Sequence, residues 1–566
     1  MKKFILLIPI LLPFILFGQN ETEKITVSVG TPYPEISGRE HEYFTDDKGN
    51  CILVKSYYQT VVIQHYDVTD MKEMNKHEYL DFPKGLKTEK CIQSGNRLFY
   101  LYSVPNKSKT LSLFAREINT ATGTFLNTQP LLETKGDVEF IYANADGIQD
   151  LYDISTHFEV KKSFDGSKIL IHYKREPTTN NKVVNYEVIG LYAFDMNLTP
   201  LWGSEKTMPY TEKKQHILSY TIEKNGRACM LAFTNDETNL QYEFFSTSLD
   251  APIQKTKLDI DPALLLQDIK MTENSEGNIN CTGYYNNGID KEYIFEKADL
   301  LDILFLNPVS KPQGSGIIFT KNINGVFRAT ISPLGTMQGK YMHEFSIEFI
   351  NKYESENAVK QNNKKEEKKK AGIADLLLHD VIENTDGSTL IIGEQKYVRF
   401  DKTIKEVTNP NQSTLNGRTT TETTRLNYTK TIVVTKLDSL GQVSWQIKLP
   451  KYQLSYIGFG SIGFKYLEID EMSYFIFLDN FDGTTFPDNI DPFLFQVSDG
   501  GNLYAYKVDN ASGTYTNLAI FDTHNVDGIT INQLPTVRIF NSDKKFLMVE
   551  FEMKGKLDNM LKIKLP

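Results

Sequence analysis

The sequence is poor in cysteine and tryptophan, with four Cys and two Trp among 566 residues. The cysteines have no tight spacing, and three of the four sit just after a glycine-containing turn. Equivalent positions in separate repeats would lie far apart, so we expect buried thiols. Export to an oxidising compartment would leave disulfide pairing as the alternative. The four residues are Cys51, Cys91, Cys229 and Cys281.

An excess of positive charge is also missing, because 62 basic residues stand against 72 acidic ones and the formal net charge is −10. Binding of phosphate backbones needs a positive face, so the composition argues against nucleic acid as a partner. The nine histidines are scattered, and no pair has zinc-ligand spacing with a supporting acid. We therefore predict no metal site and no cofactor.

Long apolar runs are absent after the first residues of the chain. Lys2 and Lys3 precede the apolar stretch Phe4 to Phe17, and Gly18-Gln19 offers a small residue for cleavage. This pattern predicts a signal peptide over residues 1–18 and a secreted, periplasmic or cell-surface protein. An uncleaved membrane anchor is the alternative, although the run is short for a span of about 20 residues. No transmembrane span is expected after signal removal.

One short phrase recurs along the chain: an acidic or amide residue, usually with glycine, followed by apolar and often β-branched residues. The glycine suits a turn that needs a positive φ, and the residues after it suit a buried strand. The copies cover residues 46–54, 163–171, 223–231, 274–281 and 382–395. A second phrase, strand, polar turn and strand, covers residues 191–202 and 433–445 and ends near the two tryptophans.

Together the two phrases describe a unit of four short strands that recurs every 45–60 residues. A propeller blade takes about 40–50 residues and buries its flat faces only against neighbouring blades. We therefore predict an all-β fold, a β-propeller of seven or eight four-stranded blades forming a single domain over residues 19–566. Blades are expected to begin near residues 39, 87, 151, 214, 268, 376, 460 and 535. The alternating segment Ile25 to Val29 is expected to supply the outer strand of the short last unit and so close the ring.

Two inserts interrupt the repeat. Residues 354–371 contain the run "NNKKEEKKK", which favours a solvated, flexible connection. Residues 406–429 are rich in Thr and Asn and are expected to form a mobile loop within the sixth unit.

The segments "SKILIHYKREP", "VIGLYAFDMNLTPLWGSEKTMPYTEKK", "HDVIENTDGSTLIIGEQKYV" and "TIVVTKLDSLGQVSWQIKLP" resemble a group of uncharacterised secreted proteins of Bacteroidota. The resemblance covers most of the chain after the signal peptide. It implies export and a propeller-like β fold, and it brings no activity and no catalytic residues to this chain.

One segment, residues 479–491, concentrates hard oxygen donors. Its candidate ligand-binding residues are Asp479, Asn480, Asp482 and Asp488. Calcium favours such oxygens, but Phe481 breaks the alternation of an EF-hand loop, so turn-stabilising hydrogen bonds are the alternative. The glycines of residues 458–463 match G-x-G-x-x-G, yet a strand follows them where a nucleotide site needs a helix. We expect them to form a bend between blades.

Two classes of function remain open. A non-catalytic binding or scaffolding module would recognise a protein or glycan partner at the cell envelope through loops on one face. An extracellular polysaccharide hydrolase or lyase would instead place paired carboxylates or a metal at the channel mouth. No catalytic residue can be assigned, and the first reading is favoured because no catalytic motif is present. The carboxylates near strand ends are Asp153, Glu187, Asp380, Glu394 and Asp479.

Overall fold

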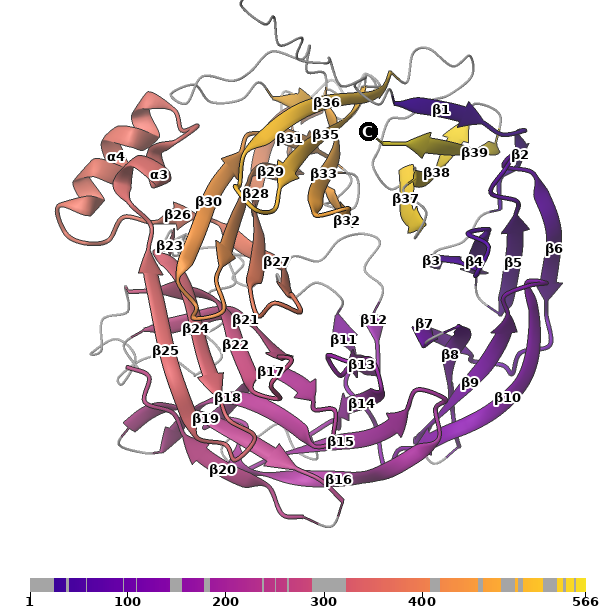
Figure 1. Cartoon of the computed structure of the whole chain (residues 1–566), viewed down its shortest axis with the longest axis horizontal. Coiled ribbons are helices and arrows are strands. Elements are labelled where there is room, and N and C mark those ends of the chain that lie inside the picture. The colour runs from indigo at the N-terminus through magenta and orange to yellow at the C-terminus, as the bar shows by residue number, and fades with distance from the viewer. Residues whose placement is uncertain are drawn as a thin grey trace, which may run out of the picture.

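The computed structural model shows a closed ring of eight blades, each a four-stranded antiparallel sheet (Figure 1). The predicted β-propeller is therefore confirmed, with eight blades. None of the helices within the described ranges combines the length and apolar character that a membrane crossing requires. The structure describes residues 25–36, 40–57, 59–94, 96–107, 109–142, 155–177, 184–236, 239–249, 251–261, 264–287, 322–407, 418–456, 462–479, 494–496, 502–522, 537–542, 546–553 and 556–565.

The first four blades follow the chain in order, and in each the first strand is nearest the channel and the fourth is outermost (Figure 1). Blade one contains β3 (Glu40–Thr45), β4 (Cys51–Tyr57), β5 (Thr60–Tyr66) and β6 (Glu73–Tyr79). Blade two contains β7 (Lys87–Ser94), β8 (Arg97–Pro105), β9 (Leu111–Asn119) and β10 (Thr124–Glu133). Blade three contains β13 (Glu159–Lys162), β14 (Lys168–Lys174), β15 (Tyr186–Asp195) and β16 (Pro200–Thr211). Blade four contains β17 (Gln215–Ile222), β18 (Ala228–Asp236), β19 (Asn239–Thr247) and β20 (Gln254–Lys257).

The remaining blades carry the insertions. Blade five contains β21 (Leu265–Glu273), β22 (Ile279–Asn286), β24 (Gly325–Ile331) and β25 (Met337–Glu344). Helices α3 (Ile347–Asn351) and α4 (Glu356–Glu366) precede blade six, which contains β27 (Leu376–Glu383), β28 (Thr389–Val407), β29 (Arg418–Leu437) and β30 (Val443–Leu449). Blade seven contains β32 (Lys465–Ile469), β33 (Met472–Asp479), β35 (Asn502–Asp509) and β36 (Tyr515–Asp522). Short pairs are formed by β11 (Ile141–Tyr142) with β12 (Ser155–Thr156) and by β23 (Asn322–Ile323) with β26 (Ile373–Ala374), while β31 (Gln453–Ser455) pairs with β29 and with β34 (Phe495–Gln496).

The eighth blade joins the two ends of the chain. It contains β37 (Val537–Ser542), β38 (Phe546–Met553) and β39 (Leu557–Lys564), and β1 (Thr26–Val29) adds the fourth strand. β1 pairs antiparallel with β39, so that Val27 lies opposite Ile563, and β2 (Tyr33–Pro34) also pairs with β39. The expected closing role of residues 25–29 is confirmed. The blade that the two ends of the chain share is the eighth.

The repeated phrase forms the tight turn between the first and second strands of a blade. Gly387 has φ +82° and its amide donates to the Asn384 carbonyl at 3.0 Å. A residue with a side chain would be strained at that φ, which explains why glycine recurs. The same positive φ occurs at Gly49, Gly166, Gly226 and Gly277.

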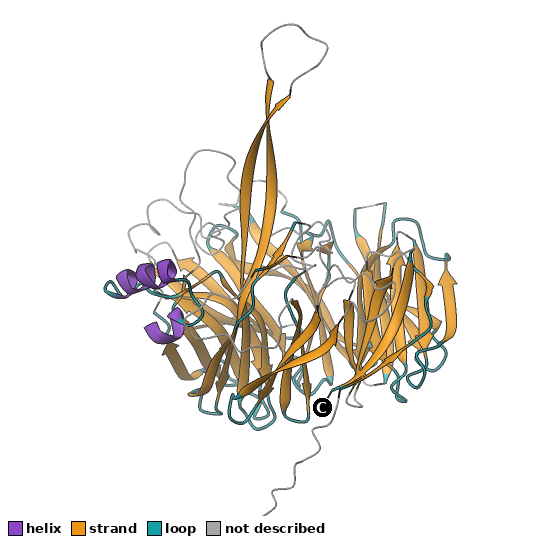
Figure 2. Ribbon diagram, turned by 90° about the horizontal axis from the view of Figure 1, so that it is seen from above, coloured by secondary structure: helices purple, strands orange, loops and turns teal. Residues whose placement is uncertain are grey.

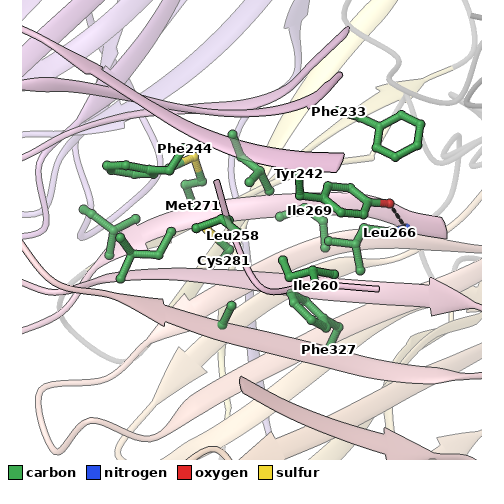
Figure 3. Packing of buried hydrophobic residues seen from close by; sticks show 14 of the residues in the cluster. Phe233, Tyr242, Phe244, Leu258, Ile260, Leu266, Ile269, Met271, Cys281 and Phe327 are labelled. Atoms are coloured by element: carbon green, nitrogen blue, oxygen red, sulfur yellow. Dashed lines mark hydrogen bonds between the residues drawn. The ribbon is translucent and has the colours of Figure 1, made fainter. Parts of the chain in front are cut away.

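The hydrophobic core lies between blades rather than within them. Figure 3 shows the junction of blades four and five, where Phe244 faces Met271 and Cys281 across the gap. Tyr242 is buried there, and its hydroxyl accepts a hydrogen bond from the Leu266 amide at 2.9 Å. Each blade thus covers the apolar face of the next. All four cysteines are buried and none forms a disulfide, as the sequence predicted.

A buried polar cluster reinforces the junction of the last and first blades. Lys55 on β4 contacts Glu550 on β38 at 2.6 Å and Asp558 on β39 at 3.2 Å. Tyr33 and Tyr43 donate hydrogen bonds to the same Glu550 carboxylate at 2.6 and 2.8 Å. A buried charge is tolerated only when it is paired and fully hydrogen-bonded. These contacts therefore join five separate strands, β2, β3, β4, β38 and β39, at the closure of the ring.

Candidate functional site

The two faces of the ring differ in how much chain they carry. In blades one to seven the first and third turns lie on one face, where they are short, whereas the second turn and the link to the next blade lie on the other face. The strand ends that flank the long connections all belong to this second face, which we call the insertion face. Figure 2 shows a two-stranded hairpin rising from it, opposite a face of short turns. Binding residues in such scaffolds concentrate on the elaborated loops.

The hairpin, here called the arm, is the extension of β28 and β29 beyond the blade. Its strands pair from Lys396 with Thr429 to Val407 with Arg418. We expected a mobile loop at residues 406–429, and that prediction was wrong for residues 418–429, which form part of β29. The physical reason is the run of threonines, because β-branched residues favour strands when a partner strand is available. Residues 408–417 lie outside the described part of the chain.

The second insertion is helical. We expected residues 354–371 to form an irregular connection, but residues 356–366 form α4 and this expectation was wrong. Lysine and glutamate are good helix formers, and the Ser355 side chain caps the helix by accepting from the Ala358 amide. Asn351 of α3 exchanges side-chain hydrogen bonds with Asn362 and Asn363, which fixes α4 against α3.

The helical insertion is fastened to blade six by a buried lysine. The Lys448 ammonium on β30 donates to the carbonyls of Ile350 and Lys352 at 2.8 and 3.0 Å, at the C-terminal end of α3. Glu354 lies 3.9 Å from both Lys448 and Lys430, and Lys430 belongs to β29 just below the arm. The two insertions therefore meet at Glu354.

The Lys448→Met variant tests this attachment, because it should change how the free energy of unfolding depends on pH. Burial lowers the pKa of Lys448 to about 8, despite the opposing charge of Glu354, whereas an unfolded lysine titrates near 10.4. The folded state releases the proton first, so the charged form opposes folding below pH 8 and this penalty is relieved as pH rises through 8 to 10. Between pH 7 and pH 10, the free energy of unfolding of the wild type should rise by about 1–3 kcal/mol relative to that of Lys448→Met. Urea unfolding of both proteins measures the difference, and an unchanged difference would refute the assignment.

Aromatic rings gather at the root of the arm. Tyr397 and Tyr428 stack with centroids 4.8 Å apart and an interplanar angle of 11°, and the ring of Tyr452 lies 5.9 Å from that of Tyr428. The Lys430 ammonium sits 4.9 Å from the centroid of the Tyr452 ring. Tyr456, which follows β31, remains 49% exposed. The root thus combines a stacked tyrosine group with a cation and one exposed ring.

A buried ion pair supports the same root from within. Lys451 contacts Glu394 at 2.6 Å and donates to Thr429 at 2.7 Å and to Gln453 at 2.9 Å. Burial alone would raise the pKa of Glu394, but Lys451 and then Lys396 reverse this effect and lower it. The carboxylate is therefore ionised and engaged in structure. Such a pair holds its β-strands together, because separating the partners would leave a buried charge without its counter-charge.

The predicted oxygen-rich loop is described only at its first residue. Asp479 is buried at the end of β33 and acts electrostatically on Lys451, so it borders the ion pair at the arm root. Asn480, Asp482 and Asp488 lie outside the described residues. Of residues 458–463, the structure describes only Ile462 and Gly463. Gly463 has φ +105°, and a Cβ added there would lie 3.5 Å from a carboxylate oxygen of Glu394.

The remaining candidate carboxylates do not form one site, because those that the structure describes lie at different blade junctions. Asp380 pairs with Lys270 of the neighbouring blade at 2.5 Å. Asp153 lies outside the described residues. Glu187 joins a cluster at the junction of blades three and four, where the Lys174 ammonium lies 2.9 Å from Glu187, 3.2 Å from Glu139 and 3.9 Å from Glu212. Sequence reasoning found Glu187 but missed its companions.

The electrostatics of the Lys174 cluster set Glu139 apart. Burial raises the pKa of Glu139, Lys174 opposes this, and the nearby carboxylates Glu187 and Glu212 raise it further. His216 on β17 is neutral at pH 7, because burial lowers its pKa to about 4. A carboxyl group with a raised pKa is the kind of group that general acid catalysis uses. Among the residues that the structure places, no three His, Cys, Asp or Glu side chains are arranged to hold a metal ion.

Comparisons with known proteins assign neither a family nor an activity to this chain. No protein-family model matches the chain, and no curated protein matches it. Similar solved structures include a prolyl endopeptidase (TM-score 0.36, 9% identity, 94% of this chain and 55% of that one), so this chain spans just over half of that enzyme's length. Others are the polysaccharide lyase Uly1 (TM-score 0.34, 12% identity, 95% and 99% covered) and the WD40 domain of SCAP from fission yeast (0.34, 6% identity, 95% and 98%). At such values these likenesses assign no activity.

Proposed function

We propose that this propeller is an exported binding module that holds a protein or glycan partner at the cell envelope through its insertion face. Export rests on the N-terminal signal pattern and on the resemblance to secreted proteins of Bacteroidota. The scaffold contributes rigidity, because each blade is locked against two neighbours. Binding then needs little ordering of the protein, which reduces the entropic cost of association.

The observation that supports this proposal is the one-sided placement of the insertions. The arm and the helical insertion are both held in defined positions, by Lys451 with Glu394 and by Lys448 with the end of α3. A two-stranded hairpin that leaves its sheet is only marginally stable by itself. The arm and the helical insertion are ordered but add no strand to the ring, so we expect them to bind a partner.

The test shortens the arm and leaves the ring intact. Val398 lies opposite Asn427, so residues 399–426 can be replaced by Asn-Gly, which forms a two-residue hairpin turn. A partner captured from the native envelope by the full mature chain should be lost with the shortened chain. The matched control is Leu440→Gln, because Leu440 is 78% exposed on the face of short turns. Equal capture by the shortened chain would refute the proposal.

The Lys174 cluster favours a second candidate, a polysaccharide hydrolase or lyase. Carboxylates that cleave glycosides lie about 5–10 Å apart, and oxygens that share one ammonium are no farther apart than this. In this reading Glu139 donates a proton to the leaving oxygen and Glu187 or Glu212 acts as the base or nucleophile.

Glycan turnover by the purified chain, screened on a broad panel, decides the second candidate. If the chain is active, Glu139→Gln should lower turnover by about 100-fold or more, and activity should fall as pH rises through the raised pKa of Glu139. Glu78→Gln on the exposed outer strand β6 serves as the control. Absence of turnover on the whole panel, or equal activity of the Glu139 variant, would count against an enzyme.

A further inference from the structure

The two insertions beside blade six carry a net positive charge, whereas the chain as a whole is net negative. Residues 354–371 hold six lysines and four glutamates, and the described arm residues 396–407 and 418–429 hold six basic and three acidic residues. The whole chain has ten more acidic than basic residues. We call this pair of segments the blade-six insertions. Charge segregation of this kind attracts a polyanion to one place and repels it elsewhere.

The lysines of the helical insertion are available for binding. Five of them are exposed, and within the described part of the chain none forms an ion pair: Lys360, Lys364, Lys368, Lys369 and Lys370. α4 buries none of its own residues. A helix that is polar on all sides has no apolar face to place in a bilayer. Its chemistry suits a soluble or matrix polymer of negative charge better than a lipid surface.

The arm root adds groups that suit sugar rings. Arg399 is 69% exposed and contacts Asp401 at 3.3 Å. Arg399 and Tyr456 both act electrostatically on Tyr428, so an exposed guanidinium and a half-exposed aromatic ring flank the same tyrosine. A guanidinium recognises carboxylate in a bidentate manner, and an aromatic face packs against the apolar face of a sugar.

We propose that the blade-six insertions bind an acidic polysaccharide, a polymer whose sugars carry carboxylate or sulfate groups. This inference rests on the proposed binding function and names its partner class. Lysines of α4 supply the sequence-tolerant attraction, while Arg399 and Tyr456 engage single sugar units. The apolar core of a protein interface would find no counterpart on the lysine-rich α4, which buries none of its own residues.

Binding of polygalacturonate to the mature chain tests the proposal, with neutral dextran and anionic phospholipid vesicles as comparison probes. Titration calorimetry should show binding to polygalacturonate and none to dextran or to the vesicles. The affinity for polygalacturonate should be lower at 300 mM NaCl than at 50 mM NaCl. The triple variant Lys364→Glu, Lys368→Glu, Lys369→Glu should bind at least tenfold more weakly. Tyr456→Ala should weaken binding while leaving the salt dependence unchanged, which separates sugar packing from charge. Lys76→Glu, an exposed lysine on β6, is the matched control.

Several outcomes would overturn the inference. They are absence of polygalacturonate binding, equal binding to the vesicles, or the same loss in the Lys76 control as in the triple variant. Failure here is distinguishable from failure of the proposed function. If polygalacturonate is not bound but shortening the arm still abolishes capture of an envelope partner, the binding module stands and only its partner class is wrong.

Discussion

Replacing Glu550 with alanine is expected to lower the free energy of unfolding by about 3–5 kcal/mol. The substitution leaves the Lys55 ammonium, which is buried and 2.6 Å from the carboxylate, without its nearest counter-charge. It also removes the acceptor of the Tyr33 and Tyr43 hydroxyls. Urea unfolding, followed by tyrosine fluorescence or circular dichroism, measures the loss.

Two further variants make the Glu550 result interpretable. Glu78→Ala, on the exposed outer strand β6 of blade one, should change stability by less than about 0.5 kcal/mol. The triple variant Lys55→Met, Glu550→Leu, Asp558→Asn should recover much of the lost stability, because it removes the three buried charges of the cluster together. A loss of under 1 kcal/mol in Glu550→Ala would show that the cluster does not contribute to ring closure.

A chain that begins at Ser37 is expected to lose the closure of the ring. This truncation removes β1, the fourth strand of blade eight, and exposes the edge of β39. It also removes Tyr33, whose side chain is buried against Glu550. Loss of one large buried aromatic residue costs about 3–5 kcal/mol, and the unpaired edge adds a tendency to aggregate. Thermal unfolding and size-exclusion chromatography should show a lower Tm and larger species than the chain that begins at Gln19.

Addition of a peptide spanning residues 25–36 tests the truncation directly. Because β1 pairs with β39 in a simple antiparallel register, the peptide should bind the open blade and raise the Tm of the truncated chain. A scrambled peptide of the same composition is the control. A truncated chain that matches the longer one in Tm and size would contradict the role of β1.

The number and order of strands could be predicted because they depend on local chemistry. A glycine at a turn such as Gly387, followed by Leu390, Ile391 and Ile392, marks the turn into the second strand of a blade wherever the pattern occurs. Repetition then requires a ring, since each sheet must cover the next. The alternation of apolar and polar residues over residues 25–29 also predicted the closing strand, because the last unit lacked a fourth strand.

The helical insertion shows where local chemistry was insufficient. The run of lysines and glutamates in residues 354–371 is compatible with either a helix or a solvated connection. Its conformation is decided by the caps at Ser346 and Ser355 and by the distant Lys448, which holds the end of α3. Lys448 and Ile350 are 98 residues apart in the sequence, and they come together only when blade six has folded.

The sequence by itself determined the propeller, its closure and its buried thiols, because turns, alternation and apolar content act over a few residues. Tertiary structure alone decided which charges meet. Glu139, Glu187 and Glu212 surround Lys174 although they come from connections and strands spread over blades three and four. Coulomb interactions depend on distance in space and on burial, and neither follows from separation along the chain.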